Sequence, residues 1–345
     1  MKKRPTIHDV AAAANVSVAT VDRVLNKRTK VREVTAQRVL LAADEVGYHA
    51  SGLLKQRLSE SRPVKRIYVL LQRSNDLFYA QIGDAIEQVL KRIDRYQFAV
   101  TLEYSESISA EKTSQSILRH KAHADAMVVV AVDHHRSHDA IEEVRSAGIP
   151  VISLVSPLSP QTCSGHIGLD HRKAGRSAAW AITRLCKKPG KVGILLGTHR
   201  YLSQQTSEDS FTRFFRESAP QFQLIEPILN LDEDELAAKA CQSLLSSHPD
   251  LVGLYSAGGG VNGIINTLKQ FNFGHNERPV VICNENTLHT RAGLQAGWID
   301  LVIATPVQQI ANELYPMLTD LLSFPPQAQT HVIELAAELY IKENL

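Results

Sequence analysis

Cysteine is scarce in this chain of 345 residues, and its four copies are widely separated. They form no CxxC pair, which argues against a zinc site or a disulfide framework and favours reduced thiols: Cys163, Cys186, Cys241 and Cys283. No apolar run reaches the roughly 18 residues that a membrane-spanning helix needs, so no membrane partner is expected. The basic N-terminus, MKKRPTIHDV, also lacks the apolar stretch of a secretory signal peptide. We therefore expect a cytoplasmic protein.

A large net charge is also lacking, since the sum is only +2, but the charges are unevenly distributed. Residues 1–62 contain 12 Lys/Arg and 6 Asp/Glu, whereas the remaining residues contain 26 and 30. A basic excess confined to a small N-terminal module indicates a polyanionic partner for that module alone. The alternative is a solvated basic tail, but such a tail would lack the apolar periodicity that this region shows.

Three short helices are predicted within residues 1–50. Thr6 and Asp9 have the spacing of a capping box, and Ser17 is a suitable N-cap for a second helix. A third helix should end at Gly47. In the second helix the apolar residues, spaced to pack on the first helix, are Val21, Val24 and Leu25. Two short helices joined by a tight turn, then a third, form a helix-turn-helix, whose second helix enters the major groove of DNA.

This module is similar in sequence to a known family. TIHDVAAAANVSVATVDRVLN, followed by VREVTAQRVLLAADEVGYHA, resembles the DNA-binding head of LacI/GalR-type bacterial repressors. The resemblance implies base-edge contacts for Val18, Ala19 and Arg23. It implies phosphate contacts for Thr6, Ser17, Thr20 and Asn26. An arginine can bond guanine O6 and N7 together, whereas phosphate contacts fix position without reading sequence. Thr6 and Ser17 can serve as helix caps and phosphate contacts at once.

Asp22 replaces the serine that the family most often has at this position. Three interpretations stay open for it. It is a solvated charge, or it holds Arg23 or Asn26 in one rotamer, or it accepts a hydrogen bond from cytosine N4. Direct contact of this carboxylate with phosphate is disfavoured because like charges repel.

The segment after this module departs from the family pattern. Family members carry a hinge helix, P-N-x-x-A-R-x-L, whose leucine enters the minor groove, but this chain has HASGLLKQRLSESRPV. Arg57 stands at the leucine position, and Gly52 weakens a helix by about 1 kcal/mol. Lys55 and Arg57 still suit a segment that lies over DNA phosphates. We predict a hinge or linker over residues 51–63 and leave open whether it folds.

From residue 64 onward, apolar runs alternate with helical stretches. The runs are RIYVLL, QFAVTLE, DAMVVVA, PVISLV, KVGILLG, LVGLYS, PVVICN and DLVIAT. Apolar strands joined by helices predict parallel sheets covered on both faces, and the series is long enough for two α/β subdomains. With GHIGLDHRKAGRSAA and AELYIKENL, residues 64–345 resemble the periplasmic-binding-protein-like effector domain of the same family. The resemblance implies a cleft for a small sugar-like effector, and a homodimer on a roughly palindromic operator.

Ligands of open α/β sheets bind where the strands end, so side chains at strand ends are candidates for effector contact. They are Asn75, Phe78, Asp133, Asp170, Asn284 and Glu285. Phe78 would stack on a sugar ring, as a similarity to the family's N-P-F-F segment implies, and Asp133 would accept hydroxyl hydrogen bonds. Structural roles stay open for each: turn formation for Asn75, core packing for Phe78, and helix capping for Asp133 and Asn284. Asp170 is expected to be mainly an N-cap.

Two family features are missing from the effector part. Where sugar-binding members carry an arginine, this chain reads SEDSF, with Ser207 and Ser210 in that region. Where members often have Asn-Asp, it has Ala257-Gly258. Loss of an arginine removes five fixed hydrogen-bond donors, so the effector is expected to differ from that of better-known members.

Two other functions fit the sequence less well. GGGVNG, Gly258 to Gly263, satisfies G-x-G-x-x-G and would suit a dinucleotide in an NAD-type dehydrogenase, but it falls late in its domain. We expect it instead to let backbone amides approach the cleft. His134, His135 and His138 supply at most two ligands on one helix face, so no metal is expected. A transport solute-binding protein would lack the N-terminal module. The sequence predicts a ligand-responsive transcriptional regulator, expected to repress a carbohydrate or polyol catabolic operon, with no enzymatic activity or cofactor.

Overall fold

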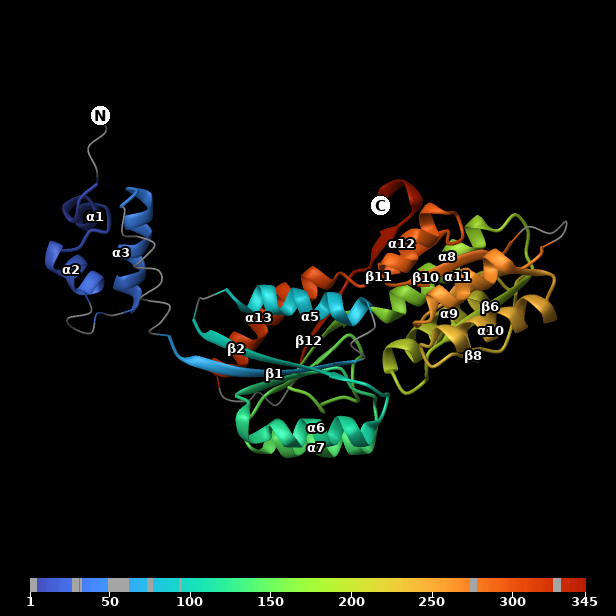
Figure 1. The fold of residues 1–345 in the computed structure, drawn as a ribbon, viewed down its shortest axis with the longest axis horizontal. Coiled ribbons are helices and arrows are strands. Elements are labelled where there is room, and N and C mark those ends of the chain that lie inside the picture. Colours follow the sequence, from blue (N-terminus) through green and yellow to red (C-terminus); the bar gives the residue numbers. More distant parts are fainter. Residues whose placement is uncertain are drawn as a thin grey trace. The chain divides into compact units, whose positions relative to one another are not determined.

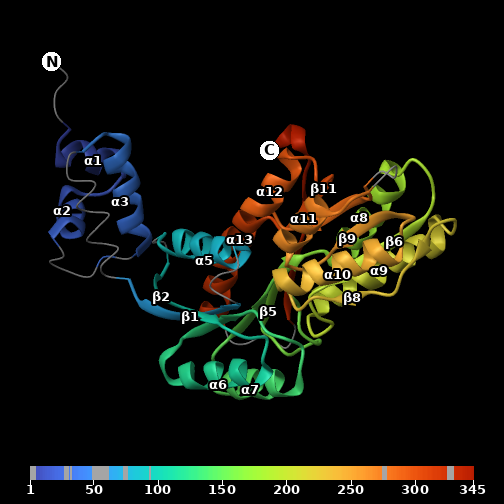
Figure 2. The same cartoon turned by 45° about the vertical axis from the view of Figure 1, so that its right-hand side comes forward.

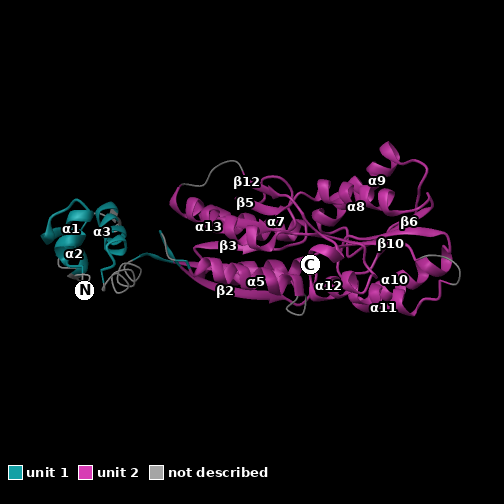
Figure 3. Ribbon diagram, turned by 90° about the horizontal axis from the view of Figure 1, so that it is seen from above, with its two compact units in different colours: residues 1–64, 92–97 teal, residues 65–91, 98–345 magenta. Residues whose placement is uncertain are grey.

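The computed structural model describes residues 5–26, 31, 33–48, 62–72, 77–92, 95–273, 278–324 and 330–345. The chain separates into two compact units, residues 1–64 with 92–97 and residues 65–91 with 98–345 (Figure 3). Asn75, Lys55 and Arg57 lie outside the described residues, as does the side chain of Asn26. The domain boundaries expected from the sequence stay predictions.

The first unit contains the three expected helices, α1 (Ile7–Ala13), α2 (Val18–Asn26) and α3 (Glu33–Glu45) (Figure 1). Their core consists of fully or nearly fully buried small apolar side chains, with Val10, Val21, Val39 and Ala43 inaccessible to solvent. Val24 is also buried, and Leu25 packs against this core from its edge. The predicted inward face of α2 is therefore confirmed.

The helix ends of this unit follow the predicted local chemistry. The Asp9 carboxylate accepts hydrogen bonds from the Thr6 amide and the Thr6 hydroxyl, each at 2.7 Å. Ser17 caps α2, since its Oγ accepts the Thr20 amide at 3.1 Å. Gly47 has φ +70 after α3, and the Tyr48 amide donates back to the Ala43 carbonyl at 2.8 Å. A left-handed residue in this place ends a helix, so the predicted stop at Gly47 is confirmed.

The second unit contains two sheets. Sheet A has the order β12-β5-β4-β3-β1-β2. Its strands are β1 (Val64–Gln72), β2 (Gln97–Ser105), β3 (Ala126–Val129), β4 (Val151–Leu154), β5 (Gly165–Leu169) and β12 (His331–Leu335). The helices are α5 (Leu77–Leu90), α6 (Ala110–His120), α7 (His135–Ser146) and α13 (Val307–Ser323), with the short helix η1 (Lys121–His123). Figures 1 and 2 show α5 and α13 on one face of the sheet and α6 and α7 on the other.

Sheet B has the order β13-β11-β10-β9-β6-β7, with β8 paired to β6. Its strands are β6 (Lys191–Leu196), β7 (Gln223–Leu224), β8 (Ile228–Leu229), β9 (Leu251–Ser256), β10 (Val280–Asn284), β11 (Leu301–Ala304) and β13 (Glu338–Tyr340). Helices α8 (His171–Leu185) and α9 (Leu202–Ser218) cover one face. Helices α10 (Asp234–Ser247), α11 (Val261–Gln270) and α12 (Leu288–Gln295) cover the other, and η2 (Lys342–Asn344) follows β13.

The predicted pair of α/β subdomains is confirmed, with one correction to strand direction. The pairs β3–β4, β4–β5, β6–β9, β9–β10 and β10–β11 are parallel, as the buried apolar runs predicted. However, β13 pairs antiparallel with β11 at the edge of sheet B. The chain passes between the sheets after β5, after β11 and between β12 and β13, so neither subdomain is one continuous segment.

Candidate DNA-binding surface and ligand cavity

The outward face of α2 carries the side chains that the sequence assigned to DNA. Ala19 and Arg23 are exposed, and Val18, Thr20 and Asp22 are partly buried. Asp22 and Arg23 therefore differ in environment although they are neighbours in the chain. An exposed arginine on the face opposite a buried apolar stripe is free to reach a base edge. The arrangement suits a recognition helix.

Of the three hydroxyl residues expected at phosphates, Thr6 and Ser17 stand at the N-caps of α1 and α2, and Thr20 lies in the first turn of α2. The Ser17 and Thr20 hydroxyl oxygens lie 2.8 Å apart, and Thr6 is bound to Asp9. Thr6 and Ser17 are nonetheless exposed. Because the first amides of a helix and its dipole favour anions, a cap residue at the surface can meet a phosphate without losing its capping bond.

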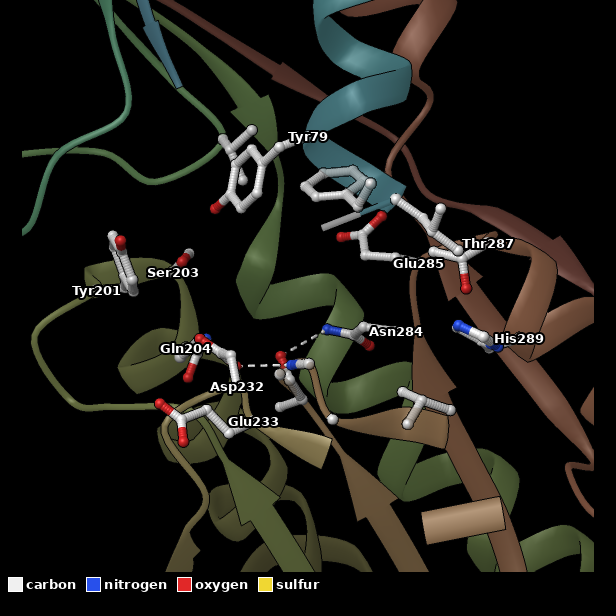
Figure 4. A pocket seen from close by; sticks show the side chains of 18 of the residues that line it. Tyr79, Tyr201, Ser203, Gln204, Asp232, Glu233, Asn284, Glu285, Thr287 and His289 are labelled. Carbon is white, nitrogen blue, oxygen red and sulfur yellow. Dashed lines mark hydrogen bonds between the residues drawn. The ribbon is translucent and has the colours of Figure 1, made fainter. Parts of the chain in front are cut away.

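A cavity of about 410 Å³ lies in the second unit, between the two sheets, where several strands end. It is lined by the start of α5, the residues after β4, the first residue of α8, the start of α9, and the loops around residues 232–235, 257–262 and 284–289. Figure 4 shows Tyr79, Tyr201, Asp232 and Asn284 approaching this space from different elements. The strand-end location matches the expectation for open α/β sheets.

Aromatic side chains form part of the wall. Phe78, Tyr79 and Tyr201 line the cavity, and the rings of Phe78 and Tyr79 lie 5.2 Å apart between centroids. Phe78 is only 7% exposed, so it serves the core as well as the cavity wall. The sequence identified Phe78 but missed Tyr79 and Tyr201. Tyr79 follows Phe78 directly, and the N-P-F-F similarity was its only available signal.

Asn284 and Glu285 both line the cavity, as predicted for the end of β10. Asn284 Oδ1 accepts the Tyr255 hydroxyl at 3.1 Å, and its Nδ2 donates to the Ala257 carbonyl at 3.2 Å. The Glu285 carboxylate accepts the Thr305 amide at 3.0 Å and the Thr305 hydroxyl at 2.8 Å. The backbone of Glu285 has φ +68, a conformation that residues other than glycine rarely adopt. Both side chains are thus held in fixed orientations at the cavity.

Asp133 and Asp170 do not line this cavity, and their contact with an effector stays a prediction. Asp133 accepts hydrogen bonds from the Ser159 amide at 2.8 Å, the Ser159 hydroxyl at 2.9 Å and His138 Nε2 at 2.7 Å. Burial opposes its charge, but these bonds outweigh burial and lower the pKa of Asp133. Asp170 caps α8 through the Lys173 amide at 3.1 Å, so its predicted capping role is confirmed.

The loop after β8 is a part of the cavity that the sequence did not reveal. Asp232 accepts the Gly259 amide at 2.7 Å and has φ +58, beside Leu231 at φ +52. This loop also explains the G-x-G-x-x-G pattern. A Cβ at Gly258 would overlap the Asp232 carboxylate, and one at Gly263 would overlap the Asp234 carbonyl. The glycines therefore let two backbone segments approach each other, and Gly258, Gly259 and Gly260 line the cavity as expected.

His171, the first residue of α8, is a buried imidazole at the cavity wall. Its Nε2 lies 3.0 Å from the Val155 carbonyl, so Nε2 carries the hydrogen and donates it. Burial lowers the pKa of His171, which keeps the ring neutral. Val155 itself has φ +65, an unusual backbone conformation for a β-branched residue.

Direct hydrogen bonds join the two subdomains around the cavity. The Ser203 amide donates to Ser156 Oγ at 3.2 Å, and Gln81 Nε2 donates to the Asn286 carbonyl at 3.3 Å. The Asp133 amide donates to the Arg200 carbonyl at 3.0 Å. Each bond connects an element of sheet A with an element of sheet B. A ligand that favours one separation of the subdomains would therefore act on these contacts.

Ser207 and Ser210, where family members place an arginine, face the packing between α8 and α9. Both are buried, and their hydroxyls lie 3.4 and 3.5 Å from the His171 carbonyl. Within the described ranges, no set of three or more His, Cys, Asp or Glu side chains is placed to hold a metal ion. In the same ranges, no helix has the length and apolar character required to cross a membrane.

Comparison with known proteins adds two family matches. The model described as "Bacterial regulatory proteins, lacI family" matches residues 6–51, and the model described as "Periplasmic binding protein domain" matches residues 67–325. The two matches together cover α1 to α3 and most of the second unit.

Individual relatives are more distant. The chain is 28% identical over 183 residues to the HTH-type transcriptional regulator DegA of Bacillus subtilis (strain 168), covering 51% of each chain. It is 25% identical over 257 residues to the ribose operon repressor of Halalkalibacterium halodurans, covering 73% of this chain and 71% of that protein. The chain thus spans about half the length of DegA and more of the ribose repressor.

Among solved structures, the second unit is similar in fold to an ABC transporter solute-binding protein from Burkholderia graminis C4D1M in complex with D-arabinose. The TM-score is 0.74 at 16% identity, covering 81% of this chain and 96% of that one. At this identity the likeness establishes the fold of the second unit.

Proposed function

Because the chain belongs to the lacI family of bacterial regulatory proteins and carries a periplasmic binding protein domain, we propose that it is a ligand-responsive repressor of a carbohydrate or polyol catabolic operon. It binds a roughly palindromic operator as a homodimer. A small effector in the 410 Å³ cavity shifts the balance between two conformations that differ in operator affinity.

One observation carries the DNA-binding half of the proposal. The exposed face of α2 presents Arg23 and Ala19, while Val21 and Val24 anchor the helix in the core. This arrangement leaves the arginine free for bidentate contact with guanine in the major groove. Of the sequence assignments, Thr6, Ser17, Val18, Thr20, Asp22 and Asn26 are proposed to support or modulate this contact.

The effector half is supported by the cavity and by the relatives. One relative is named as the repressor of a ribose operon, and a protein of similar fold was solved with D-arabinose. A polar cavity with aromatic walls suits a polyhydroxylated ligand. Phe78, Asn284 and Glu285 are the contacts proposed from the sequence, and Tyr79, Tyr201 and Asp232 are added from the structure.

The alternative of a transport solute-binding protein accounts for the second unit but leaves the helix-turn-helix without a role. The dehydrogenase alternative is weakened because packing against the loop at residues 231–235 accounts for the glycines of GGGVNG. Relatives of this chain are transcriptional regulators rather than enzymes.

The test uses a duplex selected from random DNA by the full-length protein. Arg23→Ala is expected to weaken binding to the selected duplex by about 10- to 100-fold, as loss of a bidentate guanine contact does. Fluorescence anisotropy at two salt concentrations measures the affinities. Arg38→Ala is the matched control, because Arg38 is exposed on α3 rather than α2. Operator affinity that is equal for Arg23→Ala and the parent, and independent of salt, would contradict the proposal.

A further inference from the structure

The described residues that line the cavity are rich in negative charge. Five carboxylates are among them: Asp232, Glu233, Asp234, Glu235 and Glu285. In the described lining there is no Lys or Arg, and the two histidines are His171 and His289. Asp234 and Glu235 form no ion pair with any part of the chain that the structure describes. The charge balance of these walls is therefore negative.

Two mostly buried polar side chains offer hydrogen bonds to a ligand. His171 is only 9% exposed, and its Nε2 is used by the Val155 carbonyl. Its Nδ1 is left as an acceptor and bonds to none of the described residues. Ser203 is 6% exposed, lines the same cavity, and its hydroxyl likewise has no bond to a described group. Neither atom is fully enclosed, so both are accessible from the cavity that they line, and each can bond to a ligand or a water molecule there.

Two of the carboxylates are held at the cavity by the backbone. Asp232 and Glu285 both adopt left-handed conformations, which carry a cost of order 1–3 kcal/mol for residues other than glycine. The Gly259 amide holds Asp232, and the Thr305 amide and hydroxyl hold Glu285. Their positions are thus set before a ligand arrives, which reduces the cost of ordering them on binding.

Carboxylates gathered at a concave site concentrate a negative potential. Such a site repels an anionic ligand and attracts a cation. Solvent screens the partly buried Asp232 and Glu285 less than the exposed Glu233, Asp234 and Glu235. The aromatic faces of Phe78 and Tyr79 act in the same direction, since ring faces attract ammonium groups. His171 Nδ1, a neutral acceptor, matches a hydroxyl group of the ligand that donates a hydrogen bond.

We propose that the effector is an amino-substituted sugar or polyol, bound through a protonated amine, rather than a sugar acid or sugar phosphate. This inference rests on the proposed function, since it assigns the chemical class of the ligand in the same cavity. Hydroxyl groups of the ligand bond to Asn284, Ser203 and His171, and the ammonium group faces the loop at residues 232–235. Sugar-binding family members carry an arginine in the region where this chain has Ser207 and Ser210. A site that binds a cationic ligand has no need of that positive charge.

The experiment compares matched ligands on the full-length protein by thermal shift. The probes are D-glucosamine, D-glucose and D-glucuronate, and the same three forms of D-galactose, all at equal concentration. A ligand that binds the folded state raises the melting temperature. We expect at least one amino sugar to raise it, its parent sugar to raise it less, and the corresponding acid to leave it unchanged. The amine's effect should also fall at a pH that deprotonates the amine.

Two variants test whether the charge acts at the cavity. Glu235→Gln is expected to weaken binding of the amino sugar by about two- to fivefold, the size typical of an exposed charge pair. Glu106→Gln is the matched control, since Glu106 is exposed and does not line the cavity. Equal effects of the two substitutions would overturn the assignment, even if the amino sugar bound.

The outcomes separate this inference from the proposed function. Three outcomes would overturn the amino-sugar assignment. They are stabilisation by the sugar acids, equal stabilisation by an amino sugar and its parent sugar, and no stabilisation by either amino sugar. A parent sugar that binds at least as tightly as its amine and also changes operator affinity would overturn the amino-sugar assignment while leaving the proposed repressor intact. An amine that binds without changing operator affinity would keep the ligand class and remove the regulation.

Discussion

The head, which is residues 5–48 as described, places Ala19 and Arg23 on the exposed face of one nine-residue helix. The cavity of the second unit, by contrast, is lined by side chains from seven separate segments between residues 77 and 289. In the head, the chemistry is on the surface and the core is purely apolar. In the second unit, polar residues such as His171, Asn284 and Ser203 are themselves mostly buried.

The difference determines what each region needs to function. A surface helix requires only that its apolar face be anchored, and its contacts can change without disturbing the core. Buried polar groups require partners, so the cavity is surrounded by hydrogen bonds from Thr305, Tyr255 and Gly259. Substitutions on the outer face of α2 should therefore change DNA binding alone. Substitutions at the cavity should change both the stability of the protein and its binding of a ligand.

The largest expected effect comes from placing a charge in the core of the head. Val21 is inaccessible to solvent, so Val21→Asp buries a carboxylate at a cost of several kcal/mol. A module of this size has little stability to lose, so it should unfold and DNA binding should be abolished. Calorimetry of the full-length protein should show the melting transition of the second unit unchanged.

Val34→Asp is the matched control, because Val34 is 78% exposed on α3 and should tolerate the charge. If Val21→Asp lowered the melting temperature of the second unit as well, the two regions would be coupled in stability and the contrast drawn between them would break.

An intermediate effect is expected from lowering the pH, which should reduce the folding stability of the second unit. His166 is 6% exposed and bonds to Ser153 Oγ at 2.9 Å, and burial, then the neighbouring His171, lowers its pKa from 6.5 to about 4. The unfolded chain binds the proton first, so the stability from the neutral ring is complete above pH 6.5 and is lost as pH falls towards 4. The loss amounts to about 3 kcal/mol.

Denaturant unfolding between pH 7 and pH 4.5 measures this loss, and His166→Gln should flatten the dependence. His331→Gln, at an exposed histidine, should leave it unchanged. A pH dependence that is the same with and without His166 would assign the loss to other groups, among which His171 also has a lowered pKa.

The smallest expected effect concerns Asp22, which is partly buried on α2 beside exposed Arg23. Asp22→Ser removes a charge that repels phosphate, so non-specific DNA affinity should rise by about threefold. If the carboxylate orients Arg23 or selects a cytosine, operator preference should change as well. Anisotropy with selected and random duplexes measures both, and an unaltered preference would leave only the solvated-charge interpretation.

Local patterns predicted the head well because helix caps and apolar spacing act over a few residues. Thr6, Ser17 and Gly47 each bound a helix as their chemistry requires. The strands of the second unit were also predictable, since buried parallel strands are continuous apolar runs. The antiparallel edge strand β13 was not, because it is three residues long and exposed at two of them.

The cavity was only half predictable. Asn284 and Glu285 follow a clear strand, and the strand-end rule places them correctly. Asp133 follows a strand in the same way, but its carboxylate is occupied by Ser159 and His138. Asp232 follows a two-residue strand and reaches the cavity through two left-handed residues in succession. No spacing in the sequence signals which of these carboxylates comes to line the cavity.

The passage of the chain from β12 to β13 also affects the order in which the protein can fold during synthesis. His331 of β12 pairs with Gly165 of β5, so sheet A gains its last strand only after the whole of sheet B except β13 has been made. At about 5–20 residues per second, the edge of β5 remains without its partner for on the order of ten seconds. During that interval a nascent chain has an open strand edge, the kind of surface at which chains associate wrongly. The last residues to be synthesised complete both halves of the cavity-forming unit at once.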